Sequence, residues 1–203
     1  MARLAAVNQV GESLVMMLRA RRDLLAAENR LGPVPAALDI SHLSLSRLAT
    51  AAEQTAGATI TCYRIAMSDH PIPRVMSPNP ASAATIALEL RYLVAAWSGT
   101  PAEEQAIISW VMLELAAHPT LDRSLLLGDG VWARDETVQI VPETLTDEAL
   151  FRVWDALQHK YRLSATFRAR VVRIGYGPAD TWPPAVAMRF GFADTDALAE
   201  EPV

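Results

Sequence analysis

The segment from residue 137 to residue 175 restricts the fold most, because its pattern predicts a strand, a helix and a second strand in succession. The first strand is expected over residues 137–142 and the helix over residues 146–158. Four apolar side chains recur in the helix at the spacing of a single face, namely Leu150, Val153, Trp154 and Leu157. Thr146, followed by two acids, supplies an N-cap oxygen at the end of the helix where the dipole favours negative charge. This helix is therefore expected to bury one face against a sheet.

The second strand of this unit is expected over residues 160–174, where apolar and polar side chains alternate. One face is apolar and consists of Leu163, Ala165, Phe167, Ala169 and Val171. The other face is polar and consists of Arg162, Ser164, Thr166, Arg168 and Arg170. A period of two is typical of a strand with one buried face, and the break in the alternation after residue 171 indicates a β-bulge or a strand end.

The composition is that of a folded, acidic protein. Of the 203 residues, 51% are hydrophobic, and the net charge of −5 argues against nucleic acid as a main partner. Cys62 is the single cysteine, which excludes an intrachain disulfide and a multi-cysteine metal site, and we expect it to be a small buried side chain on a strand. No apolar run is long enough to span a membrane and the start lacks a signal-peptide pattern, so synthesis and assembly in the cytoplasm are expected.

Further elements are predicted before this unit. They are a helix over residues 4–30, a strand over residues 59–67 and a strand, or alternatively a helix, over residues 85–97; residues 34–56 give no clear pattern. Another helix begins after Thr100, because Pro101 suits the first helical position and Glu103 completes a capping box. Its buried side is expected to consist of Ile107, Trp110, Val111, Leu113 and Leu115.

Together these elements predict a mixed α/β fold, in which helices flank a mixed β-sheet. We expect a single domain over residues 1–177, followed by an acidic tail over residues 178–203. Residues 70–80 hold four prolines and are expected to form an irregular loop. Loops of this length in compact domains usually serve a function.

The sequence contains no pattern that predicts an active site. The four histidines are scattered and form none of the spacings used by metal or catalytic sites. The glycines at residues 128–130 and 175–177 lack the strand–loop–helix context of a phosphate-binding loop and are expected to form turns. We therefore expect no catalytic residues, no cofactor and no metal ligands.

Several short segments, taken in order, resemble one protein family. They are IALELRYLV at residues 86–94, AHPT at 117–120, VQIVPETLT at 138–146, LFRVWDALQ at 150–158 and YRLS at 161–164. In this order they are similar to the cap, or tail-terminator, proteins of phage-tail-like contractile injection systems, a family often labelled as a domain of unknown function. The resemblance covers residues 4 to about 175.

This resemblance implies a structural role in a particle. It implies a sixfold ring that closes the distal end of the inner tube and contacts the last layer of contractile sheath. The implied fold is a tail-terminator-like mixed α/β domain without enzymatic activity. The implied partners are further copies of the chain, the inner tube protein, the sheath protein and, in some systems, a second cap variant. The particle is either retained in the cell or released from it.

Five residues are candidates for contacts with such partners. They are Arg162, Arg168 and Arg170 on the polar face of the last strand, Tyr161 at its start and Arg74 in the proline-rich loop. An ordinary solvated strand face explains the arginines equally well. The alternative function is a monomeric α/β domain that binds a peptide or small molecule through residues 70–80, and the size of the protein in solution separates the two.

Overall fold

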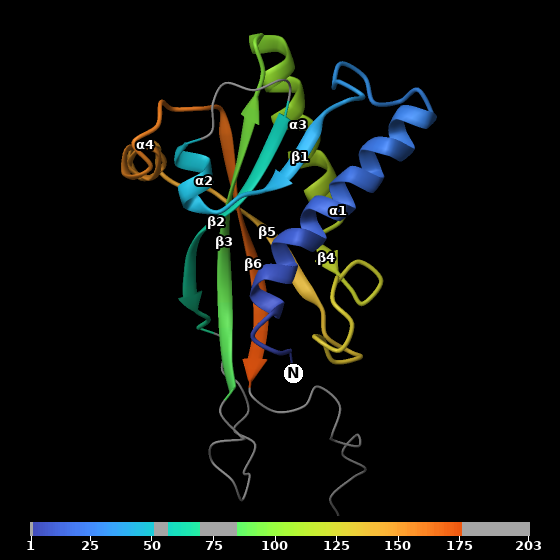
Figure 1. The fold of residues 1–203 in the computed structure, drawn as a ribbon, viewed down its shortest axis with the longest axis vertical. Helices are drawn as coiled ribbons and strands as arrows, with labels where there is room; N and C mark the ends of the chain where they lie inside the picture. The colour runs from blue at the N-terminus through green and yellow to red at the C-terminus, as the bar shows by residue number, and fades with distance from the viewer. Residues whose placement is uncertain (1, 51–56, 70–84, 176–203) are drawn as a thin grey trace, which may run out of the picture.

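The computed structural model describes residues 2–50, 57–69 and 85–175, which form a six-stranded sheet with helices on both faces (Figure 1). The helices are α1 (Ala6–Ala27), α2 (Leu45–Ala49), α3 (Pro101–Ala117) and α4 (Asp147–Ala156). The strands are β1 (Asp39–His42), β2 (Gly57–Met67), β3 (Thr85–Trp97), β4 (Thr120–Leu121), β5 (Val138–Glu143) and β6 (Ser164–Gly175). The predicted mixed α/β fold is confirmed.

The strand order in the sheet is β1-β2-β3-β6-β5-β4. Strands β1 and β2 run parallel, whereas every other neighbouring pair is antiparallel. The longest strand, β3, lies near the middle and pairs with β2 on one side and β6 on the other. Its almost continuous apolar sequence suits a strand that is covered on both faces over much of its length.

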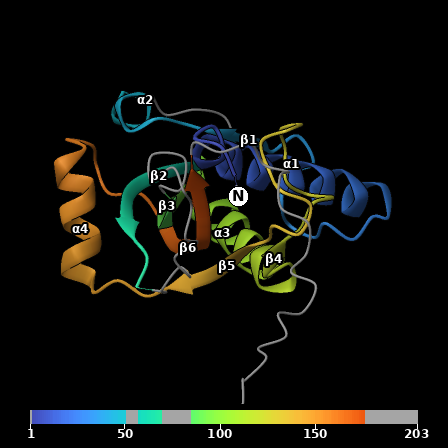
Figure 2. The same cartoon turned by 90° about the horizontal axis from the view of Figure 1, so that it is seen from below.

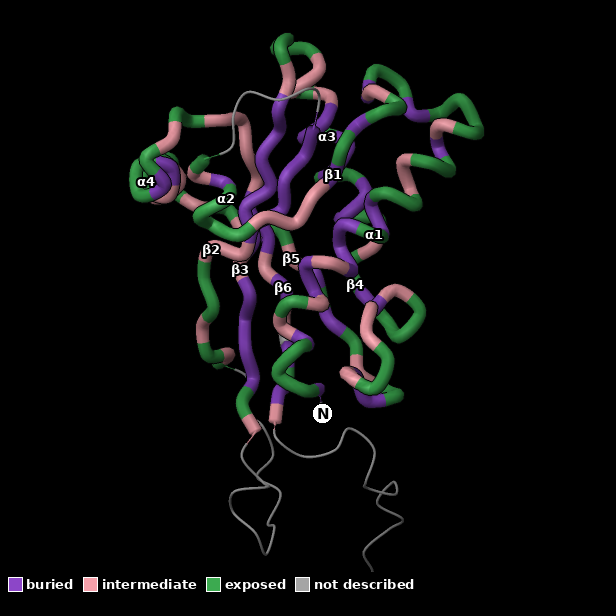
Figure 3. Tube along the Cα trace, viewed as in Figure 1, coloured by how far each residue is buried: buried purple, intermediate pink, exposed green. Residues whose placement is uncertain are grey.

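Helices α1 and α3 cover one face of the sheet, which we call the covered face (Figure 2). Leu14 and Leu18 of α1 pack there with Val111 of α3, and Tyr92 of β3 and Phe167 of β6 supply the large side chains of the sheet. All five side chains are buried, so this face is the main core. Figure 3 shows the buried residues concentrated on the central strands and on the inward sides of the two helices.

The opposite face, which we call the open face, carries a smaller apolar cluster at one end. Its buried members are Leu48 of α2, Leu93, Ala95 and Trp97 of β3, and Trp154 and Leu157 at α4. Within α4 itself Trp154 is the buried residue, and its indole N–H donates to the Ser164 hydroxyl at 3.2 Å. The predicted orientation of this helix, with Trp154 toward the sheet, is confirmed.

A β-bulge explains the break in the alternation of the last strand. Leu88 pairs with Val172 and Leu90 pairs with Ala169, so two residues of β6 lie opposite Glu89. The strand begins at Ser164, four residues later than residue 160 as predicted, since the intervening residues connect it to α4. The bulge keeps the arginines before it on the open face.

A second bulge lies in β2, between Cys62 and Arg64. Cys62 pairs with Tyr92, but Arg64 pairs with Arg91 and Ile65 with Leu90, so the register shifts at Tyr63. Because an extra residue in a strand exchanges the faces of those that follow it, Arg64 lies on the face of Arg91 and Ile65 on the face of Leu90.

The N-cap hydroxyls of α3 and α4 agree with the sequence, whereas the capping box and one predicted core residue of α3 do not. The Glu103 carboxylate accepts from the Ser98 hydroxyl, and the Thr100 amide donates to the Ser98 hydroxyl at 3.2 Å instead of to Glu103. The Thr100 hydroxyl accepts from the Glu103 amide at 3.3 Å, and the Thr146 hydroxyl accepts from the Ala149 amide at 3.2 Å. Leu113 is 67% exposed, so the prediction that it is buried is wrong. Glu114 is buried in its place and forms an ion pair with Arg21 at 2.8 Å.

The segment without a clear pattern forms β1 and α2 at one edge of the sheet. The proline-rich loop at residues 70–80 and the acidic tail at 178–203 lie outside the described residues. The division into a domain over residues 1–177 and a tail therefore remains a prediction.

Candidate functional site

The end of the open face that α2 and α4 leave uncovered carries charged side chains from three strands. They come from Arg91 and Glu89 on β3, Arg168 and Arg170 on β6, and Glu143 on β5. We call these five residues, together with Tyr63 of β2, the charged face. Strand pairing brings them together, because Arg91 lies directly opposite Arg168 and Arg168 opposite Val141 of β5.

Glu143 is the hub of the charged face. Its carboxylate accepts from Arg91 at 2.9 Å and lies 3.8 Å from the Arg168 Nε, while the Tyr63 hydroxyl donates to the other oxygen at 3.0 Å. The Glu143 side chain is 9% exposed, which places most of the carboxylate out of water. Because a carboxylate in such a place is stable only when its charge is compensated, these three partners hold each other in place.

The Tyr63 hydroxyl is held in its neutral form by this arrangement. Burial, followed by the hydrogen bond to the Glu143 carboxylate and the charge of that carboxylate, raises the pKa of Tyr63 to about 12. Tyr63 and Glu143 belong to β2 and β5, which are separated in the sheet by β3 and β6. The hydrogen bond therefore reaches across two strands and ties the two sides of the open face together.

Two of the predicted contact arginines pair with acids of the chain itself. Arg168 lies 3.6 Å from Glu89, in addition to its approach to Glu143. Arg162 lies 3.6 Å from Glu104 of α3 and stands 5.3 Å from the centre of the Trp97 ring, within cation–π distance. These pairings could not be predicted from the sequence, because the acids come from β3, β5 and α3 and approach the two arginines only through strand register and helix packing.

The remaining predicted contacts are placed differently. Arg170 is half-buried and forms no ion pair with the described residues, so it is the arginine of the charged face with most capacity for another carboxylate. Tyr161 is 46% exposed and lies 5.2 Å, ring centre to ring centre, from Phe151. Arg74 lies outside the described residues.

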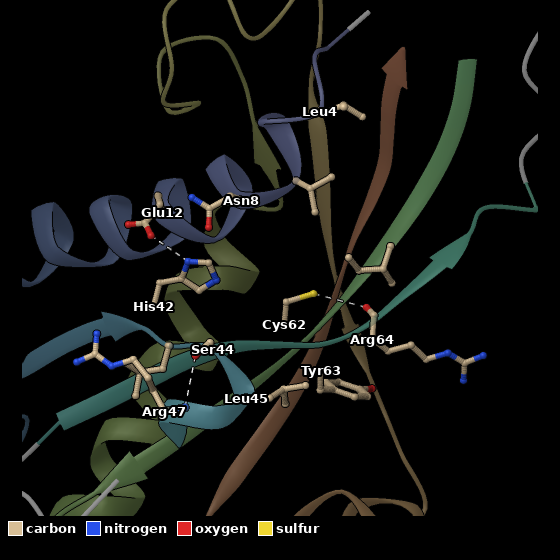
Figure 4. A pocket seen from close by; sticks show the side chains of 13 residues that line it. Leu4, Asn8, Glu12, His42, Ser44, Leu45, Arg47, Cys62, Tyr63 and Arg64 are labelled. Carbon is tan, nitrogen blue, oxygen red and sulfur yellow. Dashed lines mark hydrogen bonds and ion pairs between the residues drawn. The ribbon is translucent and has the colours of Figure 1, made fainter. Parts of the chain in front are cut away.

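A second candidate site is a groove of about 720 Å³ between α1, α2 and β2 (Figure 4). Its apolar wall is formed by Leu4, Val7, Leu43, Leu45, Cys62 and Ile65. Arg47 and Arg64 lie at opposite ends of the groove, and both are exposed. Sequence reasoning missed the groove, because two of its walls come from the segment that showed no clear pattern.

His42 closes the groove on the side of α1. Its imidazole Nδ1 lies 3.0 Å from the Glu12 carboxylate, and the ring packs directly on the backbone of Gly11. A Cβ at residue 11 would lie 2.4 Å from the imidazole, so only glycine allows this approach. The pair fixes the start of α1 against β1.

The groove does not contain the elements of nucleophilic chemistry. Burial raises the pKa of the Cys62 thiol, and its backbone hydrogen bonds lower it by less. A nucleophilic cysteine needs the opposite, a lowered pKa next to a cation. Among residues 2–50, 57–69 and 85–175 no group of three histidine, cysteine or acidic side chains is placed to hold a metal ion. Within the same residues no helix is long and apolar enough to cross a membrane.

Comparison with known proteins identifies a family and several similar solved structures, two of which are described below. Residues 9–187 match the model of the family described as Pvc16 N-terminal domain. A comparison with curated proteins gives no match. One similar solved structure is described as the PVC sheath/tube terminator of an extracellular contractile injection system in the extended state, with 18% identity and a TM-score of 0.47 over 90% of this chain and 65% of that chain. Another is the tube terminating cap of the anti-feeding prophage, with 17% identity and a TM-score of 0.47 over 84% of this chain and 60% of that chain. The chain thus spans less than two thirds of either protein.

Proposed function

Because this chain belongs to the Pvc16 N-terminal domain family, we propose that it is a structural cap subunit of a contractile injection system. The observation that carries this proposal is the family match over residues 9–187, which includes every helix and strand from β1 to β6. The motifs that resemble tail-terminator proteins, such as residues 86–94 and 150–158, lie within the matched region.

In this role the subunits form a ring, expected to be a hexamer, that ends the inner tube and contacts the last layer of sheath. The partners are further copies of the chain, the inner tube protein, the sheath protein and, where the system has one, a second cap variant. The role is non-enzymatic. Assembly takes place in the cytoplasm, on a particle that is retained or released.

The charged face is the surface that we assign to the tube or sheath. Arg170 has no acid partner among the described residues, and an arginine guanidinium offers a planar fork of donors to a carboxylate on another protein. Arg168 belongs to the same surface and would exchange or share its present partners on docking. Arg162 lies outside the charged face, against Glu104 of α3 and the Trp97 ring, and together with Tyr161 and Arg74 it remains a candidate contact. A partner segment with exposed acids is the expected complement.

The test is assembly with the tube and sheath proteins of the same system. Particles made with the cap should have a defined length, and particles made without it should have tubes and sheaths of uncontrolled length in electron micrographs. Sedimentation of the purified chain, alone and with tube, should show a species several times heavier than the 22.1 kDa monomer. A strict monomer under both conditions, with no effect on particle length, would refute the proposal and favour a binding domain that acts through residues 70–80.

A further inference from the structure

Phe151 of α4 and Tyr161, in the segment between α4 and β6, form an exposed aromatic pair. Phe151 is 50% exposed and Tyr161 is 46% exposed, and their rings meet edge to face at 79°. Three exposed acids of α4 lie within about one turn of Phe151, namely Asp147, Glu148 and Asp155, and the exposed Lys160 precedes Tyr161. We call Phe151 and Tyr161 the aromatic ridge. Large aromatic side chains held rigidly at a surface are typical anchors of protein interfaces.

The groove has the complementary character. Three of its apolar side chains are exposed, with Leu4 at 59%, Ile65 at 54% and Leu45 at 41%. Its charged ends, Arg47 and Arg64, are basic, and its single acid, Glu12, is already paired with His42. The groove is therefore an apolar surface between two cations. The same chain exposes the aromatic ridge next to the carboxylates of α4.

We propose that the aromatic ridge of one copy docks into the groove of the next copy, and that this contact builds the ring. The proposal rests on the proposed function, since it names the subunit interface of the ring. Phe151 and Tyr161 would fill the groove, while the acids of α4 face Arg47 and Arg64. Arg152 pairs with Glu148 at 2.6 Å and Lys160 adjoins Tyr161, so Asp147 and Asp155 are the acids of α4 that form no ion pair with the described residues and can face the two arginines.

The occupant is a second copy because both halves of the contact are on this chain. The ridge lies at α4 and the segment after it, whereas the groove lies between α1, α2 and β2. Figures 1 and 2 show α1 on the other side of the sheet from α4. A contact between two different surfaces of the same subunit is heterologous, and such contacts close into rings when the rotation allows. A self-complementary contact between two ridges or two grooves would stop at a dimer.

The single cysteine of the chain gives a direct test. Cys62 lines the groove, so the variant Phe151→Cys places a second thiol on the ridge, and a short bismaleimide should join neighbouring copies. Head-to-tail contact predicts a ladder of covalent species beyond the dimer on a denaturing gel. Asp155→Cys should give the same ladder while it keeps both aromatic rings. The matched control is Leu24→Cys, which adds a thiol to an exposed position of α1 outside the groove and should give no ladder.

Charge reversal tests the same contact without a cross-linker. The double variant Arg47→Glu, Arg64→Glu should weaken self-association about tenfold or more, and so should Glu148→Arg, Asp155→Arg. An equimolar mixture of the two chains should restore association, because in an alternating ring with an even number of subunits every ridge meets a groove of opposite charge. All four substitutions in one chain should restore it as well.

The possible results separate this inference from the proposed function. Rings that form normally with no ladder from either cysteine variant, or full assembly of each charge-reversed chain on its own, would overturn the ridge-and-groove contact alone. A cross-linked product that stops at the dimer would overturn the head-to-tail arrangement. A chain that remains monomeric even with tube protein, and that leaves particle length unchanged, would overturn the cap function and this interface with it.

Discussion

The two faces of the sheet are built on different principles. The covered face is closed by α1 and α3 over apolar side chains of β3, β5 and β6, whereas the open face combines a small apolar cluster with a network of arginines and acids. Apolar burial stabilises the first without regard to direction, while the charges of the second must each meet a partner. The fold is therefore held mainly by one face, and the other is left able to exchange its polar partners for those of another protein.

The largest effects should come from truncating the aromatic anchor of each face. Phe167→Ala on the covered face and Trp154→Ala on the open face are both expected to lower the free energy of unfolding by about 3–5 kcal/mol, because each removes a buried ring. Chemical denaturation of the two variants and of the exposed control Phe151→Ala measures this. If the free energy of unfolding of Trp154→Ala lies within about 0.5 kcal/mol of that of the parent chain, α4 contributes little to stability. The small apolar cluster would then not stabilise its end of the open face.

The next largest effect is expected at the hub of the charged face. Glu143→Ala should lower the free energy of unfolding by about 1–3 kcal/mol, because it leaves the Arg91 guanidinium without its closest acceptor in a partly buried place. Glu148→Ala is the matched control, since its pair with Arg152 is exposed and is worth about 0.3–0.5 kcal/mol. Equal losses for the two variants would show that the charged face is ordinary solvated surface.

A smaller effect, with a characteristic pH dependence, is expected for Tyr63→Phe. Loss of the hydrogen bond to Glu143 should cost about 0.5–1.5 kcal/mol near neutral pH. Because the pKa of Tyr63 is raised to about 12, the folded chain holds this proton more tightly than the unfolded chain does. The stabilisation is present in full below the ordinary pKa of about 10 and is lost as the pH rises toward 12. The stability difference between parent and variant should shrink over that range, and a constant difference would mean that the tyrosine ionises normally.

The smallest effect on stability, and the sharpest on function, is expected for Arg170→Ser. This residue forms no ion pair with the described residues, so the substitution should change the free energy of unfolding by less than about 0.5 kcal/mol. Arg168→Ser should cost more, because it removes a cation from Glu89, which is buried. If the charged face docks, Arg170→Ser should impair control of particle length in electron micrographs. Particles of normal length would show that Arg170 does not contribute to docking.

The features that could be predicted from the sequence are those that depend on residues close to one another in the chain. Local chemistry was sufficient for the caps at Thr100 and Thr146, the buried stripe of α4 and the bulge in β6, since each depends on residues within a few positions of one another. The family resemblance, carried by short ordered segments, is confirmed by the family match. The mixed α/β architecture followed from the order of the elements.

What the sequence did not reveal depends on contacts across the sheet. The acids that pair with Arg168 lie at residues 89 and 143, and their approach requires the strand order and both registers. The exposure of Leu113 depends on which side of α3 faces the sheet. Because apolar residues occur on every side of this helix, its sequence does not specify the buried side. The groove arises where three separate segments meet, so no single stretch of sequence contains its signal.

The anchoring of α4 has a consequence for the motions of the domain. The helix is short and Trp154 is its buried residue, so lifting it from the sheet exposes far less apolar surface than unfolding the covered face does. Cooperative units with few buried contacts open at lower free energy than the whole chain. Amide hydrogens of α4 should accordingly exchange with deuterium by local opening, ahead of those of β3 and β6. Phe151 thus lies on a part of the fold that can adjust its angle to a neighbour without disturbing the main core.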